Sequence, residues 1–283
     1  MLFSGLQRVL CIFKQYLCYE KKSCHWYVSK SFNMKHIKKR FLDSIKIDSD
    51  VLEVFNSVPI DHQKIDEIRN NGFEDYYPMM VTDKNIIQAF IYKFKNKQIA
   101  VPEPNPIVIY FHIAQQQLSS LAMAKADLFR EFEKKQPDLG IVINQSYHYF
   151  SAASTAAIFM FNALEAFINL SIPEDYQFSV EKERSTETFN KEQLQRYISF
   201  EDKIKKVMPQ ISNKKFHEEF GSKYERIKKL KSLRDEITHT KTHVDDKPNW
   251  YKELFTQLLD FDFFKTIKDC RDYINFHHAE LIE

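Results

Sequence analysis

The sequence predicts a mainly α-helical protein, in which a small α+β region precedes a C-terminal bundle of helices. Its 283 residues include only 4 Gly and 9 Pro beside 25 Phe and 14 Tyr, so turn-forming residues are scarce. This composition favours long helices over a sandwich of many short strands. Hydrophobic residues make up 43% and charged residues 28% of the chain, which is typical of a soluble globular protein with room for two modest domains.

The first 33 residues differ in composition from the rest of the chain. They are aromatic and basic, and they contain Cys11, Cys18 and Cys24 at spacings that fit no common zinc-binding pattern. Reduced cytosolic thiols are therefore the favoured interpretation. Met34 and the Lys- and Arg-rich residues after it are typical of a natural protein start. We expect residues 1–33 to be a poorly organised arm or an over-extended start.

Residues 34–106 are predicted to form the small α+β region. Residues 86–94 are β-branched and aromatic, and a second short run at 98–101 follows Lys-Asn-Lys, which predicts a β-hairpin. Three prolines between 102 and 106 then mark the clearest boundary in the chain. No group of residues typical of catalysis is found within this region.

The chain after Pro106 has a helical pattern throughout. Residues 107–143 are expected to hold a linking helix over 107–135, and residues 144–283 a four-helix bundle. The expected bundle helices lie at 144–170, around 200–208, at 223–240 and at 250–279, with a polar connection over 174–191. The helix at 144–170 is apolar nearly all round, which indicates burial in the middle of the bundle.

The charge and hydropathy patterns restrict partners and location. A formal net charge of +2 is too small for the overall field to attract nucleic acid, so any RNA contact must depend on local patches. The apolar run at residues 9–13 is too short to span a membrane and lacks a cleavage site. The helix at 144–170 carries several polar residues. We therefore expect a cytoplasmic protein without a membrane association.

One stretch points to chemistry: residues 229–240, where Arg234, Asp235 and His239 lie near the end of a charged helix. Glu165 lies in the most apolar helix, where a carboxylate is unfavourable unless a cation meets it. Arg234 is a suitable partner because a guanidinium can hold a carboxylate and still donate to a phosphate. Asn169, one turn beyond Glu165, shares its face.

An arginine and a histidine without metal ligands suit transesterification of a phosphodiester. His239 at a helix end would exchange protons near neutral pH, and Arg234 would neutralise the charge that grows on the phosphate. Such cleavage of RNA requires neither a metal nor a cofactor. Lys229, Lys231 and Lys241 are candidate phosphate contacts, although lysines on helices more commonly form a plain solvated surface.

A purely structural interpretation of the motif is open as well. An Arg and a His at one fixed spacing arise by chance in roughly three of ten such chains. A rival pair, Arg271 and His277, has five intervening residues instead of four. Arg234 could simply pair with Glu165, and the helix dipole favours a histidine such as His239 at a helix C-terminus.

Residues 144–280 resemble the HEPN family (higher eukaryote and prokaryote nucleotide-binding domains). The resemblance is carried by the order of the pieces: an apolar helix with Glu165 and Asn169, a helix at 200–208, the motif at a helix end, and a closing helix. Arg234, Asp235 and His239 match the family motif of an arginine, a polar residue and a histidine.

The resemblance implies an all-helical homodimer in which two arginines and two histidines meet in a cleft at the interface. Many family members are RNA-cutting toxins or phage-defence effectors, often neutralised by an antitoxin or another regulatory protein. Others are inactive modules that bind nucleotides or proteins. The expectation is therefore a metal-independent endoribonuclease of HEPN type. An inactive HEPN binding module and a helical scaffold with a structural Arg–Glu pair are the alternatives.

Overall fold

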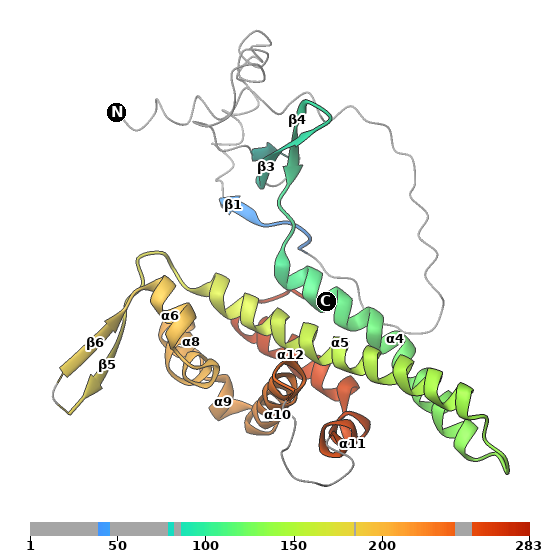
Figure 1. The fold of residues 1–283 in the computed structure, drawn as a ribbon. Coiled ribbons are helices and arrows are strands. Elements are labelled where there is room, and N and C mark those ends of the chain that lie inside the picture. The colour runs from blue at the N-terminus through green and yellow to red at the C-terminus, as the bar shows by residue number, and fades with distance from the viewer. Residues whose placement is uncertain (1–38, 46–78, 82–85, 184, 241–250) are drawn as a thin grey trace, which may run out of the picture. The chain divides into compact units, whose positions relative to one another are not determined.

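The computed structural model describes residues 39–45, 79–81, 86–183, 185–240 and 251–283. They belong to two compact units, one within Lys39–Asn105 and the other within Pro106–Glu283. Figure 1 shows the helices and strands of each unit. The arm expected at residues 1–33 lies outside the described residues, as do residues 46–78 of the expected α+β region.

The first unit is built around an antiparallel sheet of four strands. The strands are β1 (Asp43–Ile45), β2 (Met79–Val81), β3 (Ile86–Phe94) and β4 (Lys97–Pro102). The predicted hairpin is confirmed: β3 pairs with β4 from Ala89↔Pro102 to Phe94↔Lys97. Lys95 and Asn96 at the turn have φ values of 45° and 63°. Two successive residues with positive φ match the right-handed twist of the flanking strands.

The second unit begins with a long helical hairpin, α4 (Pro106–Phe132) followed by α5 (Leu139–Ser171). Pro106 occupies the first position of α4, where its missing N–H is not needed. Asp138 caps α5 by accepting hydrogen bonds from the backbone N–H groups of Gly140 and Ile141, at 2.8 and 3.2 Å. This cap lets α5 start five residues before the predicted position of 144.

Residues 174–191, expected only as a polar connection, contain regular structure. A two-stranded ribbon forms from β5 (Phe178–Lys182) and β6 (Ser185–Phe189), and α6 (Lys191–Tyr197) follows. Phe178 is buried and packs near Val180 and Phe189, which gives the base of the ribbon a small apolar cluster. The other ribbon residues whose burial is described are polar and exposed, which explains why the strand pattern is weak in the sequence.

The predicted helix around residues 200–208 is a continuous helical stretch in which a π-helical turn lies between two short α-helical segments. It comprises α7 (Phe200–Asp202), the π-helical turn η3 (Lys203–Val207) and α8 (Met208–Ser212). After α9 (Phe216–Glu219), helix α10 (Gly221–Thr238) carries the arginine motif. This helix is confirmed with an N-terminus two residues before the predicted one.

The closing helix predicted over 250–279 is instead two helices, α11 (Lys252–Asp260) and α12 (Phe263–His277). Phe261 is extended, and the Asp262 side chain accepts a hydrogen bond from the backbone N–H of Lys265 at 3.0 Å. Asp262 therefore starts a new helix. The apolar period continues across the break, which is why the sequence suggested one helix.

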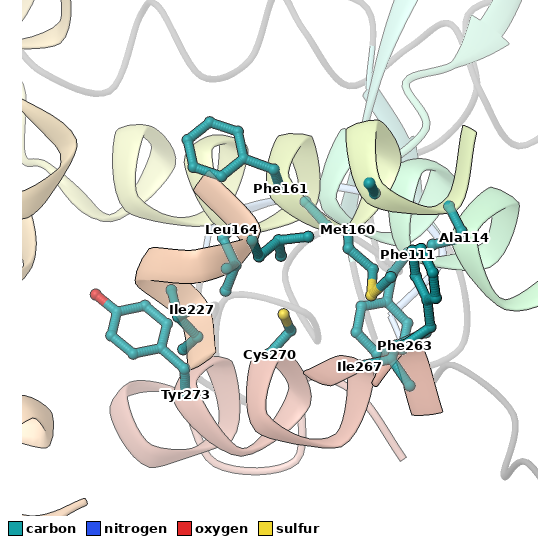
Figure 2. Close-up of a cluster of buried hydrophobic side chains, with 14 of the residues drawn as sticks. Phe111, Ala114, Met160, Phe161, Leu164, Ile227, Phe263, Ile267, Cys270 and Tyr273 are labelled. Carbon is teal, nitrogen blue, oxygen red and sulfur yellow. The ribbon is translucent and has the colours of Figure 1, made fainter. Parts of the chain in front are cut away.

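The core of the second unit lies where α4, α5, α10 and α12 meet (Figure 2). Met160 and Leu164 of α5 lie at its centre, next to Ile227 of α10 and Cys270 of α12, whereas Phe161 lies on the other side of the α5 ribbon. All five side chains are at most 1% exposed. The prediction of a mainly helical protein with α5 buried among the other helices is confirmed.

Helix α5 is the one described helix that is long and apolar enough to cross a membrane by length and composition. However, 56% of its apolar window is buried inside the protein. A core helix of a soluble protein has this property, because its apolar surface is covered by neighbouring helices. The burial is thus consistent with a soluble protein.

His277 makes the stability of the second unit sensitive to mild acid. Its Nδ1 lies 2.8 Å from Ser212 Oγ, which also donates to the Met208 carbonyl at 2.8 Å, so Nδ1–H is the donor to the serine. Burial, and then the charge of Lys214, lower the pKa of His277 to about 4, from about 6.5 in an unfolded chain. The unfolded chain therefore takes up a proton between these values that the folded protein does not.

We expect stability to be full above pH 6.5 and to decline as the pH falls toward 4. The loss is expected to be about 1–2 kcal/mol, since His277 is only half-buried and solvent screens its charge. Urea unfolding of the protein and of His277→Gln across this pH range will measure it. The variant should lose most of the decline, whereas His278→Gln, at an exposed position, should keep it.

Candidate functional site

The side chain of Arg234 projects from α10 onto α5 and makes three contacts there and nearby. Its Nη2 lies 3.1 Å from Glu165 Oε2, and its Nη1 lies 2.9 Å from Asp235 Oδ1. The guanidinium carbon lies 4.1 Å from the ring centroid of Phe161, a cation–π distance. The predicted Arg234–Glu165 pair is present. The cation–π contact with Phe161 was not predicted, because only the packing of α10 on α5 brings the Phe161 ring to the arginine.

Glu165 is less buried than the sequence indicated. Its side chain is 37% exposed and that of Arg234 is 20% exposed, so the pair lies at the surface of the bundle. The reason is that α5 is covered on its core side, whereas the face with Glu165 is only partly covered. Solvent therefore screens this ion pair, and the guanidinium is accessible to a ligand.

Asp235 connects the arginine to a lysine. Its Oδ1 accepts from Arg234, and its Oδ2 accepts from Lys231 Nζ at 2.7 Å. We call Arg234, Asp235, Glu165 and Lys231 the Arg234 cluster. Its two cations and two carboxylates balance formally, so it has no net charge while Glu165 and Asp235 are ionised.

The guanidinium of Arg234 retains donors for a ligand. Of its five N–H groups, one is given to Glu165 and one to Asp235. Nε is buried and finds no hydrogen-bond partner in the described part of the chain. Each terminal nitrogen therefore has one further N–H group that these two hydrogen bonds do not use. Guanidinium N–H groups of this kind can donate to phosphate oxygens.

His239 lies at the C-terminal end of α10, one helical turn beyond Asp235. Its backbone N–H donates to the Asp235 carbonyl at 2.9 Å, and the residue is exposed. Among the described residues, its imidazole makes no hydrogen bond with Arg234 or Glu165. The helix thus brings both motif residues to its C-terminal end without joining their side chains. Thr240 is the last described residue here, and Lys241 lies outside the described residues.

Asn169, predicted to support Arg234, contacts a different cation. Its Oδ1 accepts from Lys203 Nζ at 3.3 Å, and the same Nζ donates to the Gln195 carbonyl at 2.9 Å. Lys203 is only 2% exposed. This burial lowers the pKa of Lys203, and the charge of Glu165 opposes the shift. Lys203 is therefore a buried cation behind Glu165 that the sequence interpretation missed.

A signal for the burial of Lys203 does exist in the sequence. Phe200, Ile204 and Val207 repeat at helical spacing, and Lys203 falls on the same face. Lys203 also opens the π-helical turn, a distortion often found at functional sites. Lys205 and Lys206, by contrast, are on the surface and pair with acidic residues one turn earlier in the chain.

The two described RNA-contact candidates lie on different sides of α10. Lys231 is held by Asp235 beside the arginine. Lys229 is exposed and lines an open cavity of about 450 Å³ between α10 and α11, together with Ser232 and Gln257. Because acidic side chains also line this cavity, it is not a purely cationic groove.

The rival pair of the closing helix is separated in the structure. Arg271 is bound to Asp272 at 3.1 Å on the surface. His277 is bound to Ser212, and its ring packs against those of Tyr273 and Phe276. In the described part of the chain, no group of three His, Cys, Asp or Glu residues could hold a metal ion.

The chain matches no family model, no curated protein and no solved structure. Function is therefore inferred from the Arg234 cluster, from the position of His239, and from the motif that both residues form.

Proposed function

We propose that this protein is a cytoplasmic HEPN-type endoribonuclease that cleaves RNA without a metal ion. The observation that carries the proposal is the state of Arg234. Glu165 and Phe161 fix its guanidinium at the bundle surface, and two of its N–H groups remain as donors for a phosphate. An exposed histidine, His239, follows Arg234 in the sequence after four intervening residues. A toxin or phage-defence effector is the proposed setting, with an antitoxin or regulatory protein as a further partner.

The proposed reaction is an attack within the RNA chain. A neutral imidazole of His239 takes the proton of a ribose 2′-hydroxyl, and the 2′-oxygen forms a bond to the adjacent phosphorus. The bond to the 5′-oxygen of the next nucleotide breaks, and that oxygen receives a proton from an imidazolium. The products are a 2′,3′-cyclic phosphate and a 5′-hydroxyl. Arg234 neutralises the charge that develops on the phosphoryl oxygens.

The need for both a base and an acid supports a homodimer. Each chain has one motif histidine, His239, whereas the reaction uses one imidazole to accept a proton and one imidazolium to donate a proton. A second copy would supply the other histidine if the two motifs face each other across a two-fold axis.

The carboxylates of the cluster are proposed to position the arginine. Glu165 and Asp235 hold both terminal nitrogens of Arg234, which fixes the plane of the guanidinium. Lys231 neutralises Asp235, so this carboxylate repels an incoming phosphate less than a free one would. Asn169 holds Lys203, whose charge interacts with that of Glu165.

Incubation of purified protein with RNA in EDTA tests the proposal. We expect cleavage products with 2′,3′-cyclic phosphate and 5′-hydroxyl ends, distinguished by end-specific phosphatase and kinase treatment. Cleavage that requires a divalent ion, or that leaves 5′-phosphate ends, would contradict the proposed mechanism.

The inactive HEPN module is the second candidate function. It is favoured by the formal neutrality of the Arg234 cluster and by the absence of a hydrogen bond between His239 and Arg234 or Glu165 among the described residues. In that case, the protein should bind a nucleotide, RNA or a partner protein through Arg234 without cleaving RNA. Binding that Arg234→Ala abolishes, together with uncut RNA, would identify it.

Lys229 and Lys231 should contribute differently to RNA affinity. Among the described residues Lys229 has no ion-pair partner, whereas Lys231 is bound to Asp235. We therefore expect Lys229→Ala to reduce the slope of log affinity against log salt by about 1, as one lost phosphate contact does. Lys231→Ala should change the slope less, because it also frees the Asp235 charge. Fluorescence anisotropy with labelled RNA at 50–200 mM salt, roughly the range over which such contacts weaken, measures both.

A further inference from the structure

The free end of the α4–α5 hairpin exposes large apolar side chains that the proposed ribonuclease function does not use. We call five of them the hairpin-tip surface; with their exposed fractions they are Phe129 (44%), Phe132 (54%), Leu139 (74%), Ile143 (54%) and Tyr147 (76%). Single exposed apolar residues are common, but a group of this size on neighbouring turns usually marks an interaction site.

The residues on α5 form one row. Leu139, Ile143 and Tyr147 follow each other at intervals of four residues, and Phe150 continues the row after three more. At Phe150 the row is covered, because its ring lies 4.5 Å from that of Phe255 on α11. Toward the tip, no other described helix of the unit covers α5, because the hairpin extends beyond them (Figure 1).

The way α11 is attached shows which kind of element fits this face. Besides the Phe150–Phe255 contact, the Leu258 carbonyl accepts from Tyr149 at 2.9 Å and the Leu259 carbonyl accepts from Lys125 at 2.5 Å. Thus α11 packs across both helices of the hairpin. Phe129 follows Lys125 by one turn on α4, so the hairpin-tip surface is the next section of the same face. A helix with an apolar side is its natural cover.

The area and the charges of the tip suit a second copy of the same chain. The five side chains expose on the order of 600 Å². A standard interface buries about 800 Å² per partner, of which about 65% is apolar in homodimers. The charged residues around the tip carry both signs: Asp127, Glu131, Glu133 and Asp138 are acidic, and Arg130, Lys134 and Lys135 are basic. A surface that carries both positive and negative charges can pair with a second copy of itself across a two-fold axis. It attracts RNA or an acidic membrane only weakly.

We propose that the hairpin-tip surface is a self-association interface, on which the α4–α5 hairpin of a second copy packs to form a four-helix contact. Tyr147 precedes Glu165 by 18 residues on the same helix, which is about 27 Å. The interface is therefore separate from the Arg234 cluster and does not depend on the proposed ribonuclease function. If the motifs also pair, each chain has two different two-fold contacts, which close into a tetramer when the two axes are perpendicular.

The mass of the full chain in solution, measured by light scattering during size-exclusion chromatography, tests the proposal. The double variant Ile143→Lys/Tyr147→Lys should halve the mass of the particle. If the motifs also pair, the change is from tetramer to dimer; if they do not, it is from dimer to monomer. The matched control is Met123→Lys/Ile141→Lys. These residues are 65% and 40% exposed on the same hairpin, but Ile141 lies about 200° around α5 from Ile143. The control should keep the mass.

Three outcomes would overturn the proposal. They are a wild-type monomer at about 100 μM protein, a mass that the tip variant leaves unchanged, and an equal loss of mass in the control variant. Sedimentation with phosphatidylcholine–phosphatidylserine vesicles provides a second measurement. Vesicle binding that the tip variant abolishes, without any change of mass, would assign the surface to a membrane instead. Circular dichroism of both variants checks that the helices remain.

Discussion

Replacement of Arg234 or His239 by Ala is expected to lower the rate of RNA cleavage by at least about 100-fold each. Loss of a general base or of a positioned cationic donor typically has an effect of this size or larger. Arg234 is the donor that Glu165 and Phe161 orient, and no other described cation occupies the same position. Initial rates on end-labelled RNA in EDTA, with enzyme in excess, measure the chemical step directly.

Two matched variants control for the loss of a surface charge or an exposed ring. Arg271→Ala removes an arginine that is 39% exposed and, like Arg234, is paired with the next residue in the chain. His278→Ala removes an exposed histidine near the end of α12. Both should retain the wild-type rate. A rate lost equally in these controls would remove the assignment to Arg234 and His239. Equal cleavage by all preparations would indicate a contaminating nuclease.

The sequence was sufficient to predict the parts of the fold with strong periodic signals. The length and apolar character of α5 predicted a buried central helix, and the β3–β4 hairpin followed from β-branched and aromatic residues on both sides of a short polar turn. In both elements, the conformational preferences of the residues and the pattern of buried positions predict the same secondary structure. The Arg234–Glu165 pair was predictable for a similar reason, since a carboxylate in an apolar helix requires a cation.

What the sequence did not reveal depends on contacts between distant segments. Asp262 starts α12 although the apolar period runs through it, because one capping side chain outweighs periodicity locally. Asn169 shares the face of Glu165, yet the π-helical turn brings Lys203 to it instead of Arg234. Phe161 carries no sign of its contact with a guanidinium, because any buried phenylalanine has the same sequence pattern.

Replacement of Arg226 by Ala is expected to destabilise the protein by about 3–5 kcal/mol, the effect of leaving a buried charge unpaired. Arg226 on α10 holds Asp269 on α12 through two hydrogen bonds, one from Nε to Oδ2 and one from Nη2 to Oδ1 at 3.1 Å. The Asp269 side chain is only 4% exposed. Chemical unfolding monitored by circular dichroism measures the loss. Arg226→Met/Asp269→Leu should recover much of it, because apolar side chains can replace a buried ion pair.

The contrast with Arg234→Ala separates a structural arginine from a functional one on the same helix. Glu165 is 37% exposed and regains water when Arg234 is removed, so we expect a loss of about 1 kcal/mol or less. Arg234→Ala would then be a folded protein without activity, and Arg226→Ala a poorly folded one. If Arg234→Ala instead unfolds as easily as Arg226→Ala, the Arg234–Glu165 pair holds the bundle together. The helical scaffold would then explain the motif better than catalysis does.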